Sequence, residues 1–302
     1  MPFTPAHVAV VIPLIGSPRV RKVLDPWALG VGAMVPDLPM FLPYLSNYSR
    51  WHSPAGVVTD DVAAVFVLLA LLQFVLRDPL TALLPPRLAA RVAALPGPAW
   101  RRFPAIALGA AAGAATHVLW DSFTHEWGAA LWGWAWMTAP VVGWLNGAQV
   151  AQYASSVLGL ALTVWWVLRY LRAARTDLRP EAPGSGLDGV RPRLTARAGV
   201  AGRPEVTARA GIAGRPELTA RAEVEGRPEL TARARWGVLA GAAAGACCAA
   251  ALWTFVDPPN PLYGWAGVLA KTGVGLVVGL CAVLTVYALL WQLARVIRLT
   301  RA

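Results

Sequence analysis

Five long apolar segments constrain the fold more than any other feature of the sequence. They lie near residues 62–76, 104–125, 154–171, 236–256 and 265–293, and the first is rather short. A helix needs about 20 predominantly apolar residues to cross the hydrocarbon core of a bilayer. Only 14% of the 302 residues are charged, whereas a soluble domain carries about 25%. The sequence therefore predicts an all-α, polytopic integral membrane protein, a helical bundle with five clear spans.

Two shorter apolar stretches precede these spans, at residues 3–17 and 27–45. They are either too short to cross a bilayer or interrupted by proline, which breaks a helix interior. We expect two short N-terminal apolar helices that are tilted, re-entrant or interfacial.

A 12-residue repeat separates the spans into two blocks. It occupies residues 191–235, in units such as RPEVTARAGIAG, and holds ten Arg and five Glu. Each unit offers too little apolar surface to build a packed core. We therefore expect three regions: a membrane domain at 1–171, an Arg-rich, disordered cytoplasmic loop at 172–235, and a two-helix membrane block at 236–302. Binding of anionic lipid head groups by the arginines is a secondary hypothesis.

The distribution of Lys and Arg, which mark cytoplasmic loops, orients the chain. Residues 77–103 hold five Arg and one Asp, whereas residues 126–153 hold no Lys or Arg. The repeat and the C-terminal RVIRLTRA are basic, and the turn at 257–264 has no cation. This alternation predicts a cytoplasmic C-terminus and an external segment at 126–153. That segment carries tryptophans typical of an interfacial aromatic belt: Trp127, Trp132, Trp134, Trp136 and Trp144.

The stretch THVLWDSFTHEWG, residues 116–128, places His117, Asp121 and His125 at intervals of four. On one helix they share a stripe, because four residues advance the helix by about 40° beyond a full turn. An aspartate in mid-membrane costs about 2.5–3.5 kcal/mol on insertion scales, so the stripe indicates a shared ligand, and this spacing suits a metal ion. The stripe is about 12 Å long. Either two ions lie along it, or His117 and Asp121 bind one ion while His125 serves a neighbouring site or the substrate.

Other candidate ligands lie closer to the N-terminus. The remaining histidines of the chain are His7 and His52, and the predicted orientation puts both toward the external face. Prolines flank Asp37 in VPDLP, which ends a helix and presents the carboxylate. Taken singly, His7 or His52 is better explained as a hydrogen-bonded interior residue than as a ligand. Hydroxyl groups expected to orient the ligands are those of Thr4, Thr116, Ser122 and Thr124.

Two neighbouring carboxylates, Asp60 and Asp61, directly precede the first span. We expect both to be solvated, with one of them able to reach the site.

Four motifs resemble those of the bacterial membrane family catalogued as domain of unknown function 4184. They are MPFTPAHVAVVIPL, GAMVPDLPMFLPYL, HSPAG and THVLWDSFTHEWG, and the likeness covers residues 1–170. The resemblance implies a multi-helix bacterial membrane protein and supplies no activity.

A more distant likeness concerns the order of the ionisable residues, which is similar to that of zinc-dependent phospholipases C and predicted membrane-bound metal-dependent hydrolases. By this likeness the metal ligands correspond to His7, Asp37, His52, His117, Asp121 and His125. The phospholipases add a later His-x-x-x-Glu pair, and no histidine follows His125 here. The resemblance therefore implies one or two divalent ions, with zinc as the first choice, and not a three-zinc centre.

Two functional hypotheses follow. The first is a membrane-embedded metal-dependent hydrolase that acts on a phosphoester or lipid-linked ester at the outer face of the membrane. Whichever of Asp37 and Asp121 does not coordinate the ion would be the general base. The alternative is a non-enzymatic membrane protein, a scaffold or a metal or proton carrier; a carrier needs ionisable groups across the bilayer, and Lys271 is the main one in the second block.

The expected partners are the lipid bilayer and a lipid or phosphoester substrate. Nucleic acid is disfavoured, because the arginines lie in loops without interleaved aromatic residues. The sequence does not indicate an oligomeric state.

Overall fold

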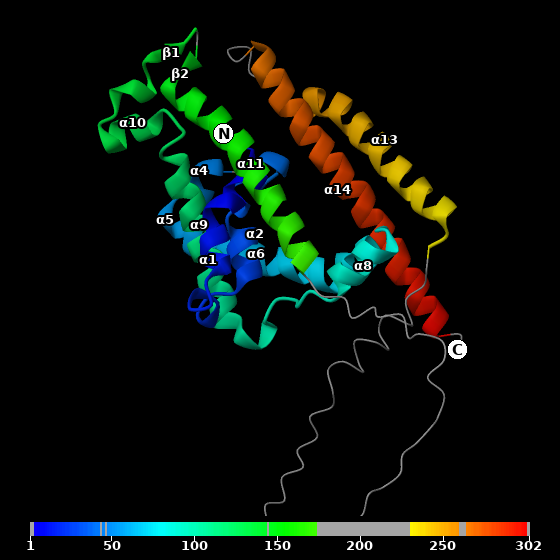
Figure 1. Cartoon of the computed structure of the whole chain (residues 1–302). Coiled ribbons are helices and arrows are strands. Elements are labelled where there is room, and N and C mark those ends of the chain that lie inside the picture. The colour runs from blue at the N-terminus through cyan, green and yellow to red at the C-terminus, as the bar shows by residue number, and fades with distance from the viewer. Residues whose placement is uncertain are drawn as a thin grey trace, which may run out of the picture. The chain divides into compact units, whose positions relative to one another are not determined.

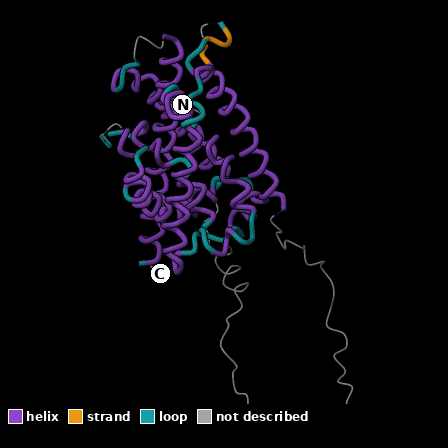
Figure 2. The backbone as a smooth tube through the Cα atoms, turned by 90° about the vertical axis from the view of Figure 1, so that its left-hand side faces the viewer, coloured by secondary structure: helices purple, strands orange, loops and turns teal. Residues whose placement is uncertain are grey.

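The structure, a computed structural model, describes residues 3–42, 44–45, 47–143, 145–173, 230–259 and 264–300. In these ranges the chain is almost entirely helical, as Figure 2 shows, and its strands are the short antiparallel pair β1 (Pro140–Val142) and β2 (Leu145–Asn146). Five helical segments are long and apolar enough to cross a membrane: Asp60–Ala82, Trp100–Asp121, Gly147–Ala173, Ala232–Val256 and Gly267–Arg298. The predicted all-α class and its five spans are confirmed.

Short helices make up the part of the chain before the first span. They are η1 (Thr4–His7), α1 (Val8–Gly16), η2 (Val20–Lys22), α2 (Pro26–Gly32), η3 (Val35–Asp37), α3 (Leu38–Phe41), α4 (Tyr48–Trp51) and α5 (Pro54–Val58). Proline stands in the first turn of α2, η3, α3 and α5, where its missing N–H is no loss. The two predicted apolar stretches are therefore helical but interrupted, and the turns between their helices place polar side chains inside the bundle.

The spans themselves are built from the following elements (Figure 1). The first comprises α6 (Asp60–Ala70), the π-helical η4 (Leu71–Leu76) and α7 (Arg77–Ala82), and is followed by α8 (Pro86–Ala93) and η5 (Trp100–Arg102). The second is α9 (Phe103–Asp121), after which come α10 (Trp127–Trp132), η6 (Ala135–Met137) and the two strands. The others are α11 (Gly147–Ala173), α13 (Ala232–Val256) and α14 (Gly264–Leu299). Most of the predicted repeat loop lies outside the described residues.

Small residues bring α2 and α9 into backbone contact. A methyl group at Gly113 would lie 2.4 Å from the carbonyl oxygen of Leu29, and one at Gly32 would lie 2.5 Å from that of Ala110. Gly109 and Gly113 have the four-residue spacing of close helix contacts in membranes. This contact fixes the C-terminal end of α9 beside the turn that follows α2 and leads into η3.

A buried aspartate anchors the start of α2. The Asp25 carboxylate accepts hydrogen bonds from the backbone N–H groups of Trp27 and Ala28, at 2.9 and 3.0 Å, and from that of Ala99, at 3.0 Å. Asp25 is only 3% exposed, and these donors offset the cost of burying its charge. The cap therefore links α2 to the segment that precedes α9.

The last two spans, α13 and α14, lie side by side (Figure 1) and also meet through small residues. A methyl group at Gly279 would lie 2.6 Å from the carbonyl oxygen of Gly245. The C-terminal half of α14 is joined to the first span, since Tyr287 donates to the carbonyl oxygen of Pro79 at 3.1 Å and Gln292 to that of Val75 at 3.0 Å.

Candidate metal centre

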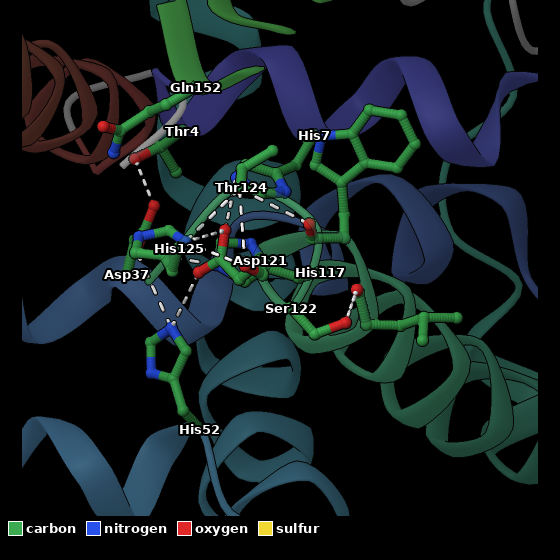
Figure 3. Close-up of polar contacts among 12 residues, drawn as sticks. Thr4, His7, Asp37, His52, His117, Asp121, Ser122, Thr124, His125 and Gln152 are labelled. Atoms are coloured by element: carbon green, nitrogen blue, oxygen red, sulfur yellow. Dashed lines mark hydrogen bonds and ion pairs between the residues drawn. The ribbon is translucent and has the colours of Figure 1, made fainter. Parts of the chain in front are cut away.

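Six ionisable side chains from four parts of the chain converge at the end of α9 (Figure 3). Asp37 ends η3, His52 follows α4, His7 ends η1, and His117 and Asp121 lie on the last turns of α9, with His125 just beyond it. Residues separated by more than 100 positions in the sequence thus meet in one place because the short N-terminal helices pack around α9.

Four of these side chains offer ligand atoms that all lie within 4.8 Å of one another: those of Asp37, His52, His117 and Asp121. His117 Nε2 lies 3.5 Å from both Asp37 Oδ1 and Asp121 Oδ2. His52 Nε2 lies 3.6 Å from Asp121 Oδ2 and 3.9 Å from Asp37 Oδ1. We call this set the four-ligand cluster.

The separations within the four-ligand cluster match the spacing around an ion better than they match hydrogen bonds. Charge-assisted N–H···O bonds are about 2.7–2.9 Å long, shorter than the four histidine–carboxylate separations of 3.5–3.9 Å. Two ligands held at about 2.0–2.2 Å by a tetrahedral zinc ion are about 3.3–3.6 Å apart. Asp37, His117 and Asp121 are at most 2% exposed, so the like charges of two carboxylates are buried together. The donor set and its geometry therefore fit a divalent cation.

Outer hydrogen bonds orient the ligands as metal sites require. His117 Nδ1 donates to the carbonyl oxygen of Ala33 at 2.9 Å, which leaves the Nε2 lone pair for a ligand. Thr4 Oγ1 donates to Asp37 Oδ2 at 2.7 Å. Tyr48 instead contacts two of the ligand atoms themselves: its hydroxyl donates to Asp37 Oδ1 at 3.1 Å and lies 2.9 Å from His52 Nε2.

His7 and His125 lie on the other side of the Asp121 carboxylate. Asp121 Oδ1 is 3.6 Å from His7 Nε2 and 3.6 Å from His125 Nδ1, whereas Oδ2 faces the four-ligand cluster. The His7 ring stacks on His117 with a centroid distance of 3.8 Å. In the described residues both nitrogens of His7, Nε2 of His125 and Oδ1 of Asp121 are buried without a hydrogen-bond partner. The structure thus brings all six predicted ligands together but divides them into two groups.

The predicted stripe of His117, Asp121 and His125 on one helix is wrong, because α9 ends at Asp121. Hydroxyl groups terminate the helix by binding its last carbonyl oxygens: Ser122 Oγ donates to Leu119 at 2.6 Å, and Thr124 Oγ1 to Trp120 at 3.4 Å. His125 lies in the following turn, where its Nδ1 is 3.0 Å from the carbonyl oxygen of Asp121. The turn keeps His125 beside Asp121, so the 12 Å separation expected from a straight helix does not apply.

Burial and neighbouring charges set the protonation of the groups outside the spans. Burial, reinforced by the nearby His117, lowers the pKa of His7 to about 4. Burial alone would raise the pKa of Asp37, but interactions with His117 and Thr4 outweigh it and the pKa falls below its ordinary value. A neutral imidazole and an ionised carboxylate are the forms that bind metal ions. Burial and the charge of Asp37 raise the pKa of Tyr48, which stays a hydroxyl donor.

Two residues near the site were not assigned to it from sequence. Tyr48 contacts both Asp37 and His52, and its position four residues before His52 was the available signal. Asp61, expected to be solvated, is fully buried, interacts electrostatically with His117, and has no hydrogen-bond partner in the described residues. Asp60 does lie at the surface, in an ion pair with Arg50 at 2.5 Å.

Of the four hydroxyl groups expected to orient the ligands, two contact ligand side chains and two donate to carbonyl oxygens of α9. Thr4 binds Asp37, and Thr124 Oγ1 lies 3.3 Å from His125 Nδ1. Thr116 instead donates to the carbonyl oxygen of Gly113 on its own helix, and Ser122 to that of Leu119.

Exposed tryptophans surround the end of α9. The described members of the predicted belt are 38–50% exposed: Trp127, Trp132, Trp134 and Trp136. Trp132 donates to Ser122 Oγ at 3.0 Å, which attaches the aromatic group to the residue after Asp121. Trp144 lies outside the described residues.

A family model described as a domain of unknown function, DUF4184, matches residues 1–289. The chain belongs to this family. The DUF4184 match extends beyond the resemblance seen at residues 1–170 and includes α13 and most of α14. No curated protein and no solved structure matches the chain. The likeness to zinc-dependent phospholipases C stays a prediction.

Proposed function

We propose that this DUF4184 protein is a membrane-embedded, metal-dependent hydrolase of phosphoesters or lipid-linked esters. The observation that carries the proposal is the spacing of the buried four-ligand cluster, 3.5–3.9 Å between its histidine nitrogens and carboxylate oxygens. Zinc is the first choice, because two imidazoles and two carboxylates suit it. A second ion would take Asp121 Oδ1 with His7 and His125.

A divalent ion held there would polarise a phosphoryl or carbonyl oxygen and activate water for attack. Asp37 has one oxygen in the four-ligand cluster and the other bound by Thr4. Asp121 has one oxygen in the cluster, while its Oδ1 is without a hydrogen-bond partner in the described residues. Whichever of these two carboxylates does not coordinate the ion would be the general base. It takes a proton from water as the water oxygen bonds to phosphorus or carbon, and the proton passes to the leaving alcohol as the ester bond breaks.

The charges at the two ends of α9 support a position of the centre at the outer face of a bacterial cell membrane. Arg101 and Arg102 precede α9, and Arg102 contacts the carbonyl oxygens of Arg21 and Lys22. These cations gather at the end of α9 away from Asp121, and cations mark the cytoplasmic side. With the C-terminus in the cytoplasm, a C-terminal fluorescent-protein fusion should fluoresce and a C-terminal alkaline phosphatase fusion should be inactive. The opposite result would place the metal centre on the cytoplasmic side.

A carrier needs ionisable groups along a path through the membrane. In the described part of α13 and α14, Lys271 is already paired with Asp257. This ion pair favours the hydrolase over a carrier that passes between these helices.

Hydrolysis by the detergent-purified chain tests the proposal. A chromogenic phosphodiester and a chromogenic carboxylic ester are the probes, with bound zinc measured on the same samples. Asp121→Asn and His117→Ala should each lower hydrolysis by at least about 100-fold and should reduce bound zinc. Asp78→Asn is the matched control, because this carboxylate lies at the other end of the first span, paired with Arg295 at 3.4 Å. Equal loss in Asp78→Asn, or hydrolysis that survives both cluster variants, would overturn the proposal.

A further inference from the structure

An apolar groove adjoins the segment that carries Asp37. Its volume is about 200 Å³, and Thr4 provides the one polar side chain among the residues that line it. Its walls include Met34, Leu38 and Phe41 around η3 and α3, Leu68 of α6 and Val277 of α14.

The groove adjoins the metal centre at Thr4. Thr4 lines the groove and donates its hydroxyl proton to Asp37 Oδ2 at 2.7 Å. Val35 and Leu38, on either side of this aspartate in the sequence, also line the groove. A ligand in the groove therefore lies next to a residue that holds a member of the four-ligand cluster.

Two residues that line the groove, Leu68 and Val277, lie on helices long and apolar enough to cross the membrane. The same helices carry exposed apolar side chains, such as Val67 at 66% and Leu276 at 39%, which face hydrocarbon and not water in a bilayer. The lining of the groove is apolar as well, so a lipid chain would meet similar chemistry in the groove and in the bilayer.

We propose that the groove binds the hydrocarbon chain of a membrane lipid whose polar head group lies at Thr4 and the metal centre. The inference rests on the proposed hydrolase and narrows its natural substrate class to membrane lipids. A closed apolar cavity of about 150 Å³ stays dry and binds a benzene-sized ligand. The groove therefore has room for a segment of one chain, with the remainder in the bilayer.

Photocrosslinking in nanodiscs tests the inference. The probe is a phospholipid with a diazirine in the half of one acyl chain nearer the glycerol, and the labelled residues are found by mass spectrometry. We expect labels on the stretch from Met34 to Phe41 and around Val277. Labels confined to outward-facing positions such as Leu158, which is 69% exposed on α11, would overturn the inference.

Two variants fill the groove from opposite walls, so that if one of them fails to fold, the other can still be tested. Met34→Trp and Val277→Trp should each reduce labelling of the opposite wall by about fivefold or more, because the indole takes the space of the chain. Leu158→Trp is the control and should leave groove labelling unchanged. Thermal unfolding in detergent identifies any variant that fails to fold. Undiminished labelling in both folded groove variants would contradict the inference.

Bound zinc separates this inference from the proposed function. If the wild-type chain retains zinc but the groove is not labelled, the metal centre is supported and the lipid-binding groove is contradicted. If the groove is labelled but the chain retains no zinc, the proposed hydrolase is contradicted and the protein is a lipid-binding membrane protein.

Discussion

The α2–α9 and α13–α14 pairs both pack through glycine, but among the described residues only the first pair buries ionisable side chains. A methyl group at Gly113 in the α2–α9 pair would lie 2.4 Å from a carbonyl oxygen, and one at Gly279 in the α13–α14 pair would lie 2.6 Å from one. The buried described residues of α13 are alanines, whereas α9 buries His117 and Asp121. Close packing in a membrane does not require polar groups. His117 and Asp121 of α9 therefore need another explanation, which a bound metal ion would supply.

The largest effect is expected where glycine packing supports the site. Gly113→Leu would force apart α2 and α9, and such overpacking costs about 3 kcal/mol or more. Ala33 belongs to the same helix contact, and its carbonyl oxygen accepts the hydrogen bond that orients His117. Gly113→Leu should therefore also cause the loss of bound zinc. Thermal unfolding and zinc content measure the two effects.

Gly279→Leu is the matched change in the other pair. It should destabilise the chain by a similar amount while zinc stays bound in the folded fraction. If Gly113→Leu retained its zinc, or Gly279→Leu lost it, the packing around α9 would not be what builds the site.

Asp61 tests whether a buried carboxylate beside the four-ligand cluster takes part in metal binding. Its buried carboxylate has no hydrogen-bond partner in the described residues, so Asp61→Leu should stabilise the chain by about 1–3 kcal/mol with zinc unchanged. Asp25→Leu is the control and should destabilise, because three N–H groups lose their acceptor. Loss of zinc in Asp61→Leu would instead make Asp61 part of the metal centre.

Thr4 tests the outer hydrogen bonds of the site. Thr4→Val removes the donor to Asp37 and should weaken zinc binding by about tenfold with little change in fold, as measured by competition with a chelating dye. Thr254→Val removes a hydroxyl that bonds only a carbonyl oxygen of its own helix, α13, and should leave zinc affinity unchanged. Equal affinities in the two variants would show that Thr4 does not orient the ligand.

The smallest effect is expected at the ion pair between Asp257, which follows α13, and Lys271 of α14. Lys271 and Asp257 are about one-third exposed, and exposed ion pairs contribute below about 1 kcal/mol. Lys271→Met should therefore shift the thermal unfolding temperature only slightly and leave zinc bound. A large loss of stability would mean that polar contacts, and not small residues, hold α13 to α14.

The length of the apolar segments and the low charge content were sufficient to predict the spans, because a backbone surrounded by hydrocarbon must satisfy its own hydrogen bonds and therefore forms a helix. The ligand types were also predictable, since His117 and Asp121 are conspicuous in an apolar helix. The residue at which α9 ends was not predicted. The helix ends where the hydroxyl groups of Ser122 and Thr124 donate to its last carbonyl oxygens, and the apolar pattern does not reveal these hydrogen bonds.

The burial of Asp61 depends on tertiary contacts that no local pattern records, whereas the four-residue spacing of Tyr48 and His52 indicates only one of the two contacts of Tyr48. A carboxylate in the first turn of a span is ordinarily solvated, and only the packing of α6 against its neighbours encloses Asp61. Tyr48 becomes a site residue because the α4 turn folds over Asp37.

The central claim is that the four-ligand cluster holds a divalent metal ion, and the zinc content of the purified wild-type chain tests it most directly. The chain is isolated in mild detergent without chelators, exchanged against zinc, freed of unbound metal and analysed by elemental mass spectrometry beside His117→Ala. The account predicts one or two tightly held ions per wild-type chain and at least one fewer in the variant. Wild-type protein that is folded yet retains no zinc, manganese or iron would contradict it.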